Sequence, residues 1–168
     1  MAIADVLRVF QQLKREGVVR DYLIFGSVAA MVHTEPFYTE DIDIGVATDS
    51  DSEFMEIWRS VAAHGTIEGM AIVIGGTPVE VFPVDARPII QDAIAHALRK
   101  RVEGILVKVT PPEHLMLEAL STYRNKDKAR VFLLEEAVDR TKLRELLRRL
   151  DHDGTIRRRY EALSGSPL

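Results

Sequence analysis

Two aspartates placed for chemistry, Asp41 and Asp43, stand close together in the apolar stretch TEDIDIGV. Side chains alternate between the faces of a β-strand, so the two carboxylates point to the same side, roughly 6–7 Å apart along the chain. Ile42, Ile44 and Val46 then point the other way, toward a core. Paired carboxylates repel one another and lose hydration on burial, so a cation is expected between them. Oxygen ligands at this spacing suit Mg²⁺, which also contacts phosphates.

A glycine and a serine, Gly26-Ser27, follow the apolar run Tyr22–Phe25, which is typical of a buried strand. Glycine at a strand-to-helix turn lets the backbone approach a ligand, and the free N–H groups of the new helix attract an anion. The Ser27 hydroxyl can cap that helix and donate to a phosphate oxygen. An anion site followed by a carboxylate pair is the layout needed to hold a nucleoside triphosphate with its metal ions.

The spacing of these two features resembles a known signature. Gly26-Ser27, thirteen intervening residues and then Asp41-Ile42-Asp43 resemble the motif of the nucleotidyltransferase superfamily with the DNA-polymerase-beta-like fold. The sequence from Thr39 to Ile44 strengthens the match. The closest resemblance is to minimal members of this superfamily, including the nucleotidyltransferases of toxin–antitoxin pairs. The resemblance implies a metal-dependent transfer of a nucleoside monophosphate from a nucleoside triphosphate, expected to be ATP, to an acceptor hydroxyl, with release of pyrophosphate.

A third carboxylate is expected, because two-metal phosphoryl transfer needs a ligand beside the nucleophile. In the family that the chain resembles it comes from a neighbouring strand, and Glu80, alone among Val79, Val81 and Phe82, is the best candidate. Asp85 is the reserve. The alternative is that Glu80 is a solvated residue on an edge strand. The predicted catalytic and metal-binding residues are therefore Asp41, Asp43 and Glu80, with a two-metal Mg²⁺ site.

A basic cluster lies in the segment YRNKDK at residues 123–128. It resembles the helical motif with which minimal nucleotidyltransferases hold the triphosphate. By that resemblance Lys126 and Arg124 contact phosphate and Asp127 orients them, beside Gly26 and Ser27 as the other nucleotide-binding residues. Lys108, between two valines of a predicted strand, is a further candidate for the same cleft. The alternative is an ordinary charged helix start.

Composition and charge restrict the class of protein. The chain has 168 residues, 46% hydrophobic and 29% charged, which is an ordinary globular composition. It contains no cysteine, no apolar run long enough to cross a membrane and no signal pattern at its start, so a cytoplasmic location is expected. Residues 1–120 carry 10 Lys/Arg against 18 Asp/Glu, and residues 121–168 carry 12 against 8. This asymmetry fits metal ligands in the first part and phosphate-facing cations in the second.

Periodicity predicts an α/β (α+β) fold, a mixed sheet flanked by helices with a helical C-terminal layer. The resemblance implies that this sheet is nucleotidyltransferase-like. We expect residues 1–110 to form the core and residues 111–168 to pack on it as one compact unit. Helices are predicted over residues 3–15, 27–33, about 51–64 and 88–98, and from residue 112 onward. Strands are predicted over residues 22–25, 41–47, 70–74, 79–84 and 105–109, with a hairpin at Gly75-Gly76.

The histidines and the arginine run near the C-terminus give weaker indications of function. The five histidines show no zinc-ligand spacing, so each is expected to be a surface or packing residue. The run Arg157–Arg159 could bind nucleic acid, although a solvated helix is the simpler reading. Two rival functions therefore stay open: a catalytically degenerate relative that binds a cognate partner protein, and a nucleic-acid-binding module. The acceptor of the favoured enzyme could be RNA, a protein hydroxyl or a small molecule.

Overall fold

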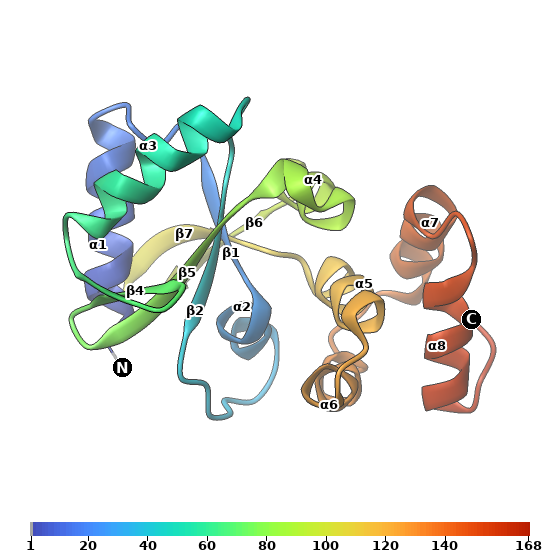
Figure 1. Cartoon of the computed structure of the whole chain (residues 1–168). Helices are drawn as coiled ribbons and strands as arrows, with labels where there is room; N and C mark the ends of the chain where they lie inside the picture. Colours follow the sequence, from blue (N-terminus) through green and yellow to red (C-terminus); the bar gives the residue numbers. More distant parts are fainter. Residues whose placement is uncertain (1) are drawn as a thin grey trace.

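A computed structural model describes residues 2–168. Helices and strands alternate through its first two-thirds, and only helices follow (Figure 1). The elements are α1 (Ile3–Arg15), β1 (Tyr22–Phe25), α2 (Gly26–His33), β2 (Ile42–Val46), α3 (Asp51–Ala62), β3 (Thr66–Glu68), β4 (Ala71–Ile74), β5 (Thr77–Pro83), a 3₁₀ turn η1 (Val84–Ala86), α4 (Pro88–Ala95), β6 (Leu98–Val102), β7 (Ile105–Val109), α5 (Pro112–Thr122), α6 (Asn125–Leu134), α7 (Arg140–Leu150) and α8 (Thr155–Ser164).

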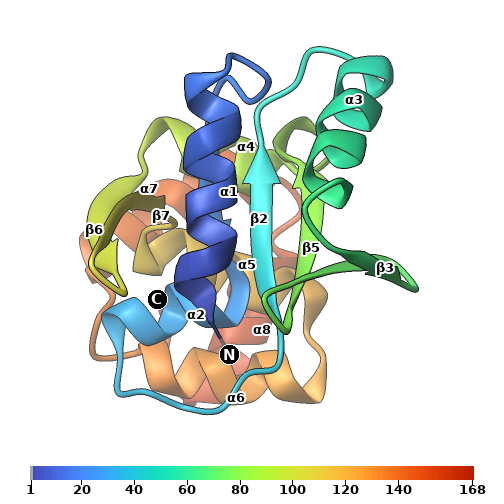
Figure 2. The ribbon, with the colours of Figure 1, turned by 90° about the vertical axis from the view of Figure 1, so that its left-hand side faces the viewer.

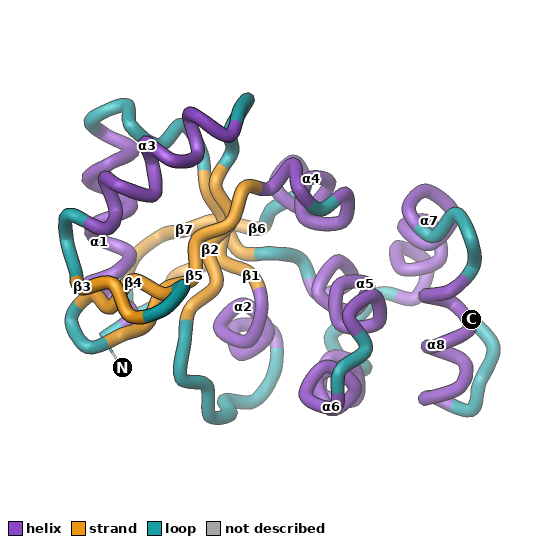
Figure 3. The backbone as a smooth tube through the Cα atoms, in the orientation of Figure 1, coloured by secondary structure: helices purple, strands orange, loops and turns teal. Residues whose placement is uncertain are grey.

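The described strands form one mixed sheet in the order β3-β4-β5-β2-β1-β7-β6 (Figure 3). Its centre combines an antiparallel pair, β1 with β2, and two parallel pairs, β2 with β5 and β1 with β7. Parallel neighbours need crossover connections, which α2, α3 and α4 help to supply. The predicted mixed sheet flanked by helices is confirmed.

Two-residue hairpins join β4 to β5 and β6 to β7, and a third joins the edge strand β3 to β4. Gly75 and Gly76 both have positive φ, +57° and +78°, as a two-residue turn between β4 and β5 requires. Glu103 and Gly104, with φ of +47° and +80°, make the equivalent turn between β6 and β7. The first hairpin matches the prediction at Gly75-Gly76.

Helices cover both faces of the sheet. Helices α1 and α3 lie over one face, and α2, α4 and α5 lie on the other side (Figures 1 and 2). Ile42, Ile44 and Val46 are fully buried in the main core, which includes residues of α1 and α3. On the other face Leu23 and Phe25 pack with Ile90 of α4 in a smaller cluster. The alternation of β2 thus leaves Asp43 on the face away from α1, as the sequence predicted.

The C-terminal helices are arranged around α5. This helix contacts α2 and α4 on the sheet side and α6, α7 and α8 on the other, and its residues Pro112–Leu120 are all buried. Helices α7 and α8 lie farthest from the sheet (Figure 1). The result is a helical layer whose inner members, α5 and α6, face the ends of the central strands.

Two strands were not predicted. Strand β3 is short and exposed, and β6 has the sequence LRKRV, whose charges give no strand alternation. The helix predicted over residues 88–98 therefore ends at Ala95, because Leu98 begins β6. Among the described residues no helix combines the length and apolarity that spanning a bilayer requires.

Candidate active site

One cavity of about 140 Å³ brings together all seven predicted site residues. It lies where β1 passes into α2, beside β2 and β5 and opposite the junction of α5 with α6. Its predicted members are Gly26, Ser27, Asp41, Asp43, Glu80, Arg124 and Lys126, and its other lining residues are Phe25, Phe82, Arg87, Glu118, Thr122 and Arg130.

Gly26 makes the turn from β1 into α2 with a φ of +65°, a conformation that glycine adopts without strain. A Cβ atom at this position would lie 1.8 Å from Oδ2 of Asp43. Glycine is therefore required twice, by the backbone angle and by the carboxylate beside it. Its absence of a side chain lets the turn and Asp43 share one wall of the cavity.

The three carboxylates come from adjacent strands. Asp43 of β2 stands directly opposite Glu80 of β5 in a parallel register, so both side chains leave the same face of the sheet. Asp41 immediately precedes β2, and its Oδ1 accepts a hydrogen bond of 3.2 Å from Oγ1 of Thr39. None of the three carboxylates forms an ion pair with a residue that the structure describes.

This unpaired negative charge changes the acidity of Asp43. Burial, together with the neighbouring charges of Asp41 and Glu80, raises the pKa of Asp43 to about 7, and Arg130 and Lys126 oppose the shift only in part. Near neutral pH the site thus holds a carboxylate that is costly to ionise. A divalent cation with oxygen ligands would remove that cost, so the donor set fits Mg²⁺.

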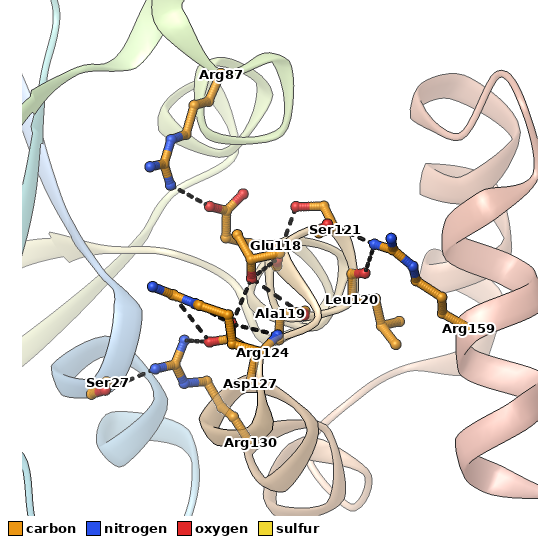
Figure 4. Close-up of polar contacts among 11 residues, drawn as sticks. Ser27, Arg87, Glu118, Ala119, Leu120, Ser121, Arg124, Asp127, Arg130 and Arg159 are labelled. Atoms are coloured by element: carbon orange, nitrogen blue, oxygen red, sulfur yellow. Dashed lines mark hydrogen bonds and ion pairs between the residues drawn. The ribbon is translucent and has the colours of Figure 1, made fainter.

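The opposite wall is basic and comes from the start of α6. Arg124 is the N-cap residue of α6, and Lys126 lies in its first turn. Asp127, fully buried, accepts hydrogen bonds from Nε of Arg124 at 2.7 Å and from Oγ1 of Thr122 at 2.8 Å (Figure 4). Lys126 lines the cavity and forms no ion pair within the described chain. The structure therefore places Asp127 as the residue that orients Arg124.

Sequence reasoning missed Arg130, which joins the two walls. It is only 8% exposed, and its Nη2 donates a 2.8 Å hydrogen bond to Oγ of Ser27, a residue 103 positions away (Figure 4). Arg130 follows Lys126 by four residues, so both lie on one side of α6. That helical spacing was the available signal. It identifies a shared face but not the contact with Ser27.

A second missed pair, Arg87 and Glu118, borders the cavity. The guanidinium of Arg87, the residue before α4, lies over the ring of Phe82. Its Nη1 lies 2.6 Å from Oε1 of Glu118 in α5 (Figure 4). Nothing local in the sequence pairs these two residues. Their contact links α4 to α5 beside the cavity.

Two further candidates do not belong to this cavity. Lys108 was expected to reach the cleft, and this was wrong: its ammonium pairs with Asp21, and it lines a separate cavity next to α1. Val107 and Val109 are buried on the α1 face of β7, so Lys108 projects from the other face, where its ammonium meets Asp21 just before β1 rather than the cavity. Asp85, the reserve for the third carboxylate, is exposed on η1 and does not line the cavity.

Two of the five histidines belong to a cluster that their spacing did not reveal. Ligand atoms of Asp92, His96 and His114 lie within 4.8 Å of one another, a group that could hold a metal ion. However, Arg149 donates to both oxygens of Asp92 at 3.0 Å, and Nε2 of His114 lies 2.8 Å from Oδ2 of the same carboxylate. Both oxygens of Asp92 are therefore already hydrogen-bonded. We call the contacts of Asp92 with His114 and Arg149, which join α4, α5 and α7, the clasp.

The arginine run of α8 is largely used inside the molecule. Arg159 donates to the backbone carbonyls of Leu120 and Ser121 at 2.8 and 2.7 Å (Figure 4). Its guanidinium also lies over the ring of Tyr123. Arg158 donates to the carbonyl of Asp153 at 3.0 Å. The Arg159 contacts anchor α8 to the end of α5, and the Arg158 contact stays within the start of α8.

Comparisons with known proteins find similar folds among solved structures. No family model and no curated protein sequence matches the chain. Among solved structures, it is similar to an antigenic nucleotidyltransferase-like protein from Paracoccidioides brasiliensis, with a TM-score of 0.55 and 17% identity over 92% of this chain and 90% of that one. It is also similar to the antibiotic-resistance factor ANT(2'')-Ia, with a TM-score of 0.58 and 17% identity over 98% of this chain and 97% of that one.

A second structure of ANT(2'')-Ia, in complex with adenylyl-2''-tobramycin, has a TM-score of 0.57 to this chain, with 17% identity over 94% and 96% of the two chains. The fold is therefore nucleotidyltransferase-like over nearly the whole chain. At this identity the likeness concerns the fold, and the chemistry has to be argued from the site.

Proposed function

We propose that the protein is a Mg²⁺-dependent nucleotidyltransferase that moves a nucleoside monophosphate from a nucleoside triphosphate to an acceptor hydroxyl. One observation carries the proposal: three carboxylates, none ion-paired within residues 2–168, face two arginines and a lysine across a single cavity at a Gly-Ser turn. Acids for metal ions and cations for a triphosphate are the two halves that this reaction requires.

The chain's own groups bind the nucleotide at the turn and at α6. The backbone of Gly26 and the hydroxyl of Ser27 lie at the N-terminus of α2, where N–H groups attract phosphate oxygens. The hydrogen bond from Arg130 fixes the Ser27 hydroxyl. Lys126 and Arg124 supply charge-assisted contacts to the triphosphate, and Asp127 keeps the guanidinium of Arg124 in place.

Asp41, Asp43 and Glu80 would hold the metal ions. Bound there, divalent ions would supply positive charge against the negative charge that develops on the transferred phosphoryl group and on pyrophosphate. Glu80 lies on the side of the cavity away from Ser27, on β5. We therefore assign it to the acceptor side, where its carboxylate accepts the hydroxyl proton.

The likeness to ANT(2'')-Ia, whose structure holds an adenylylated small molecule, supports ATP as donor and a hydroxyl as acceptor. RNA and protein hydroxyls are the other acceptor classes. Membership of a toxin–antitoxin pair, with a cognate partner protein in the cytoplasm, is our proposal for its biological setting and rests on the resemblance of the Gly26–Asp43 motif.

The test is Mg²⁺-dependent binding and turnover of nucleoside triphosphates. Wild-type protein should bind an α-labelled NTP only with Mg²⁺ and release pyrophosphate when an acceptor is supplied. Asp41→Asn and Glu80→Gln should lower the transfer rate by at least about a hundredfold, the order expected when a metal ligand of the reacting centre is lost.

The matched control is Asp85→Asn, since this exposed acid lies near Glu80 in sequence but outside the cavity. It should keep wild-type transfer. If Mg²⁺-dependent NTP binding is absent from the wild type, the catalytic proposal is wrong and the partner-binding alternative takes its place.

A further inference from the structure

A second cavity lies at the start of β1, the opposite end of that strand from the candidate active site. It has a volume of about 480 Å³, within the usual range for sites that bind small molecules. We call it the β1–β7 cavity. Its walls include Lys14 and Arg15 in the last turn of α1, the segment Asp21-Tyr22, Arg99 of β6 and residues 106–108 of β7.

The β1–β7 cavity exists because β1 and β7 pair at one end only. Val109 of β7 stands beside Ile24 of β1, and the backbone N–H of Thr110 donates to the carbonyl of Ile24 at 3.0 Å. No earlier pairing joins these two strands within residues 2–168, so the sheet is open toward the start of β1. Helix α1 lies beside β7 and closes one side of the opening (Figure 2).

Positive charge gathers around this opening. The lining side chains are four cations and one acid, Asp21, which accepts a hydrogen bond from Nζ of Lys14 at 2.8 Å and also pairs with Lys108. The other two cations, Arg15 and Arg99, are exposed, and neither forms an ion pair within residues 2–168. The cavity is therefore a local concentration of positive charge in residues 1–120, where 18 Asp/Glu outnumber 10 Lys/Arg.

The chemistry of the walls suits a phosphate attached to an apolar group. A guanidinium can hydrogen-bond to two phosphate oxygens at once, and two unpaired guanidinium groups can offset both charges of a phosphate dianion. The uncharged part of the wall contains Leu106, which is 49% exposed, and the ring of Tyr22, which lies 5.9 Å from Nζ of Lys14. These side chains offer apolar contact to the rest of a ligand.

We propose that the β1–β7 cavity binds a small phosphomonoester, whose phosphate is held by Arg15 and Arg99 and whose apolar group packs against Leu106 and Tyr22. The lining cations come from α1, β6 and β7 and surround one cavity, which favours a single compact dianion over an extended chain of phosphates. The site does not depend on the proposed nucleotidyl transfer, because it shares no lining residue with the catalytic cavity.

Phenyl phosphate is the probe, since it consists of a ring and a phosphate that is mostly doubly charged at neutral pH. Titrated into the full chain without Mg²⁺, at about 0.15 M salt, it should shift the backbone amide NMR signals of Tyr22 and Lys108. Benzyl alcohol, which lacks the phosphate, should not. Shifts confined to Ser27 and Lys126 would place the phosphate in the catalytic cavity and overturn the proposal.

The informative variant is Arg99→Gln, because Arg99 is exposed and its replacement leaves the core intact. It should raise the Kd for phenyl phosphate at least about tenfold, as the loss of a charge-assisted contact predicts, and Arg15→Gln should do the same. The matched control is Lys100→Gln, which removes the same charge from the next residue of β6, exposed but outside the cavity. It should change the Kd less than about twofold, since salt screens exposed charges.

Equal weakening by Arg99→Gln and Lys100→Gln would indicate a diffuse basic surface and refute the site. A nucleic-acid strand is the other source of phosphate, and an oligouridylate without terminal phosphates should not displace phenyl phosphate. Displacement by that strand at a lower concentration than unlabelled phenyl phosphate requires would overturn the small-molecule assignment. Asp43→Asn should bind phenyl phosphate as the wild type does, so failure of the catalytic proposal is seen separately from failure of this one.

Discussion

At the end of β1, the backbone of Gly26 lies so close to the carboxylate of Asp43 that no side chain fits between them. Gly26→Ala would place a methyl group 1.8 Å from Oδ2 of Asp43 and would strain a backbone with positive φ. We expect loss of Mg²⁺-dependent NTP binding by more than about tenfold, because Asp43 must move. The strain alone costs about 1–2 kcal/mol.

Gly17 offers the matched control for this change, because it also has positive φ, +78°, but an added Cβ would have no atom within 4 Å. Gly17→Ala should lower the free energy of unfolding and leave NTP binding intact. Equal binding by the two variants, measured by calorimetry, would show that Gly26 serves only the backbone.

The raised pKa of Asp43 makes stability depend on pH. Its pKa is about 7 in the folded protein against the ordinary 3.8, so the unfolded chain ionises first as pH rises. The folded state is therefore destabilised progressively from about pH 4 to pH 7, and the loss persists above. Without metal, Asp43→Asn should raise the Tm by about 3–6 °C at pH 8 and by less at pH 5.

Mg²⁺ provides the complementary measurement at pH 8. It should raise the Tm of the wild type, because it binds the folded carboxylates, and should have a smaller effect on Asp43→Asn. Thermal unfolding followed by circular dichroism, with EDTA as the metal-free reference, measures both. A variant less stable than the wild type at pH 8 would contradict the proposed electrostatic cost.

Among the elements, the start of α6 combines a structural and a functional role. Asp127 caps the helix through the backbone N–H of Arg124 and also holds its side chain and that of Thr122. Asp127→Ala should destabilise the fold by about 1–3 kcal/mol, because buried donors lose their acceptor. It should also raise the KM for the NTP, because Arg124 is released.

The control for this cap is Asp139, which caps α7 through the N–H groups of Thr141 and Lys142 and lies outside the cavity. Asp139→Ala should cost about 1 kcal/mol and leave the KM unchanged. Chemical denaturation and steady-state kinetics on both variants separate the two roles of Asp127. A matching KM change in Asp139→Ala would mean that stability alone governs binding.

Most elements were predictable because their signals are local. The alternation around Asp43 and the Gly75-Gly76 turn gave strands and a hairpin in the right places. Strand β6 was missed because its charged sequence is stabilised by pairing with β7, and the hint was the Glu103-Gly104 turn. The contacts of Arg130 with Ser27 and of Lys108 with Asp21 could not be predicted, since they join residues 103 and 87 positions apart.

At the scale of the molecule, the clasp on Asp92 holds the helical layer to α4. Burial raises the pKa of Asp92, but hydrogen bonds from His114 and Arg149 outweigh it and hold this pKa below its usual value. The stability that the clasp contributes is therefore present above about pH 4 and lost as pH falls through the folded pKa.

Arg149→Ala tests the clasp. Because Arg149 is about half exposed, we expect a loss of about 1 kcal/mol at neutral pH, smaller at high salt and below pH 4. The neighbouring exposed Arg148 forms no ion pair within the described chain, so Arg148→Ala should leave stability within about 0.5 kcal/mol of wild type. Urea titrations at two pH values measure the free energy of unfolding of both variants. An equal loss of stability in Arg149→Ala and Arg148→Ala would argue against the clasp.

The acidic and basic walls of the cavity are also synthesised at different times during translation. A ribosome synthesises the chain from its N-terminus, so Asp41, Asp43 and Glu80 emerge well before Arg124, Lys126 and Arg130. A nascent chain that has reached only α5 carries the negative half of the pocket with nothing opposite it. Under the proposed function, nucleotide binding has to wait until α6 has been translated and has docked, so it comes late in synthesis of the chain.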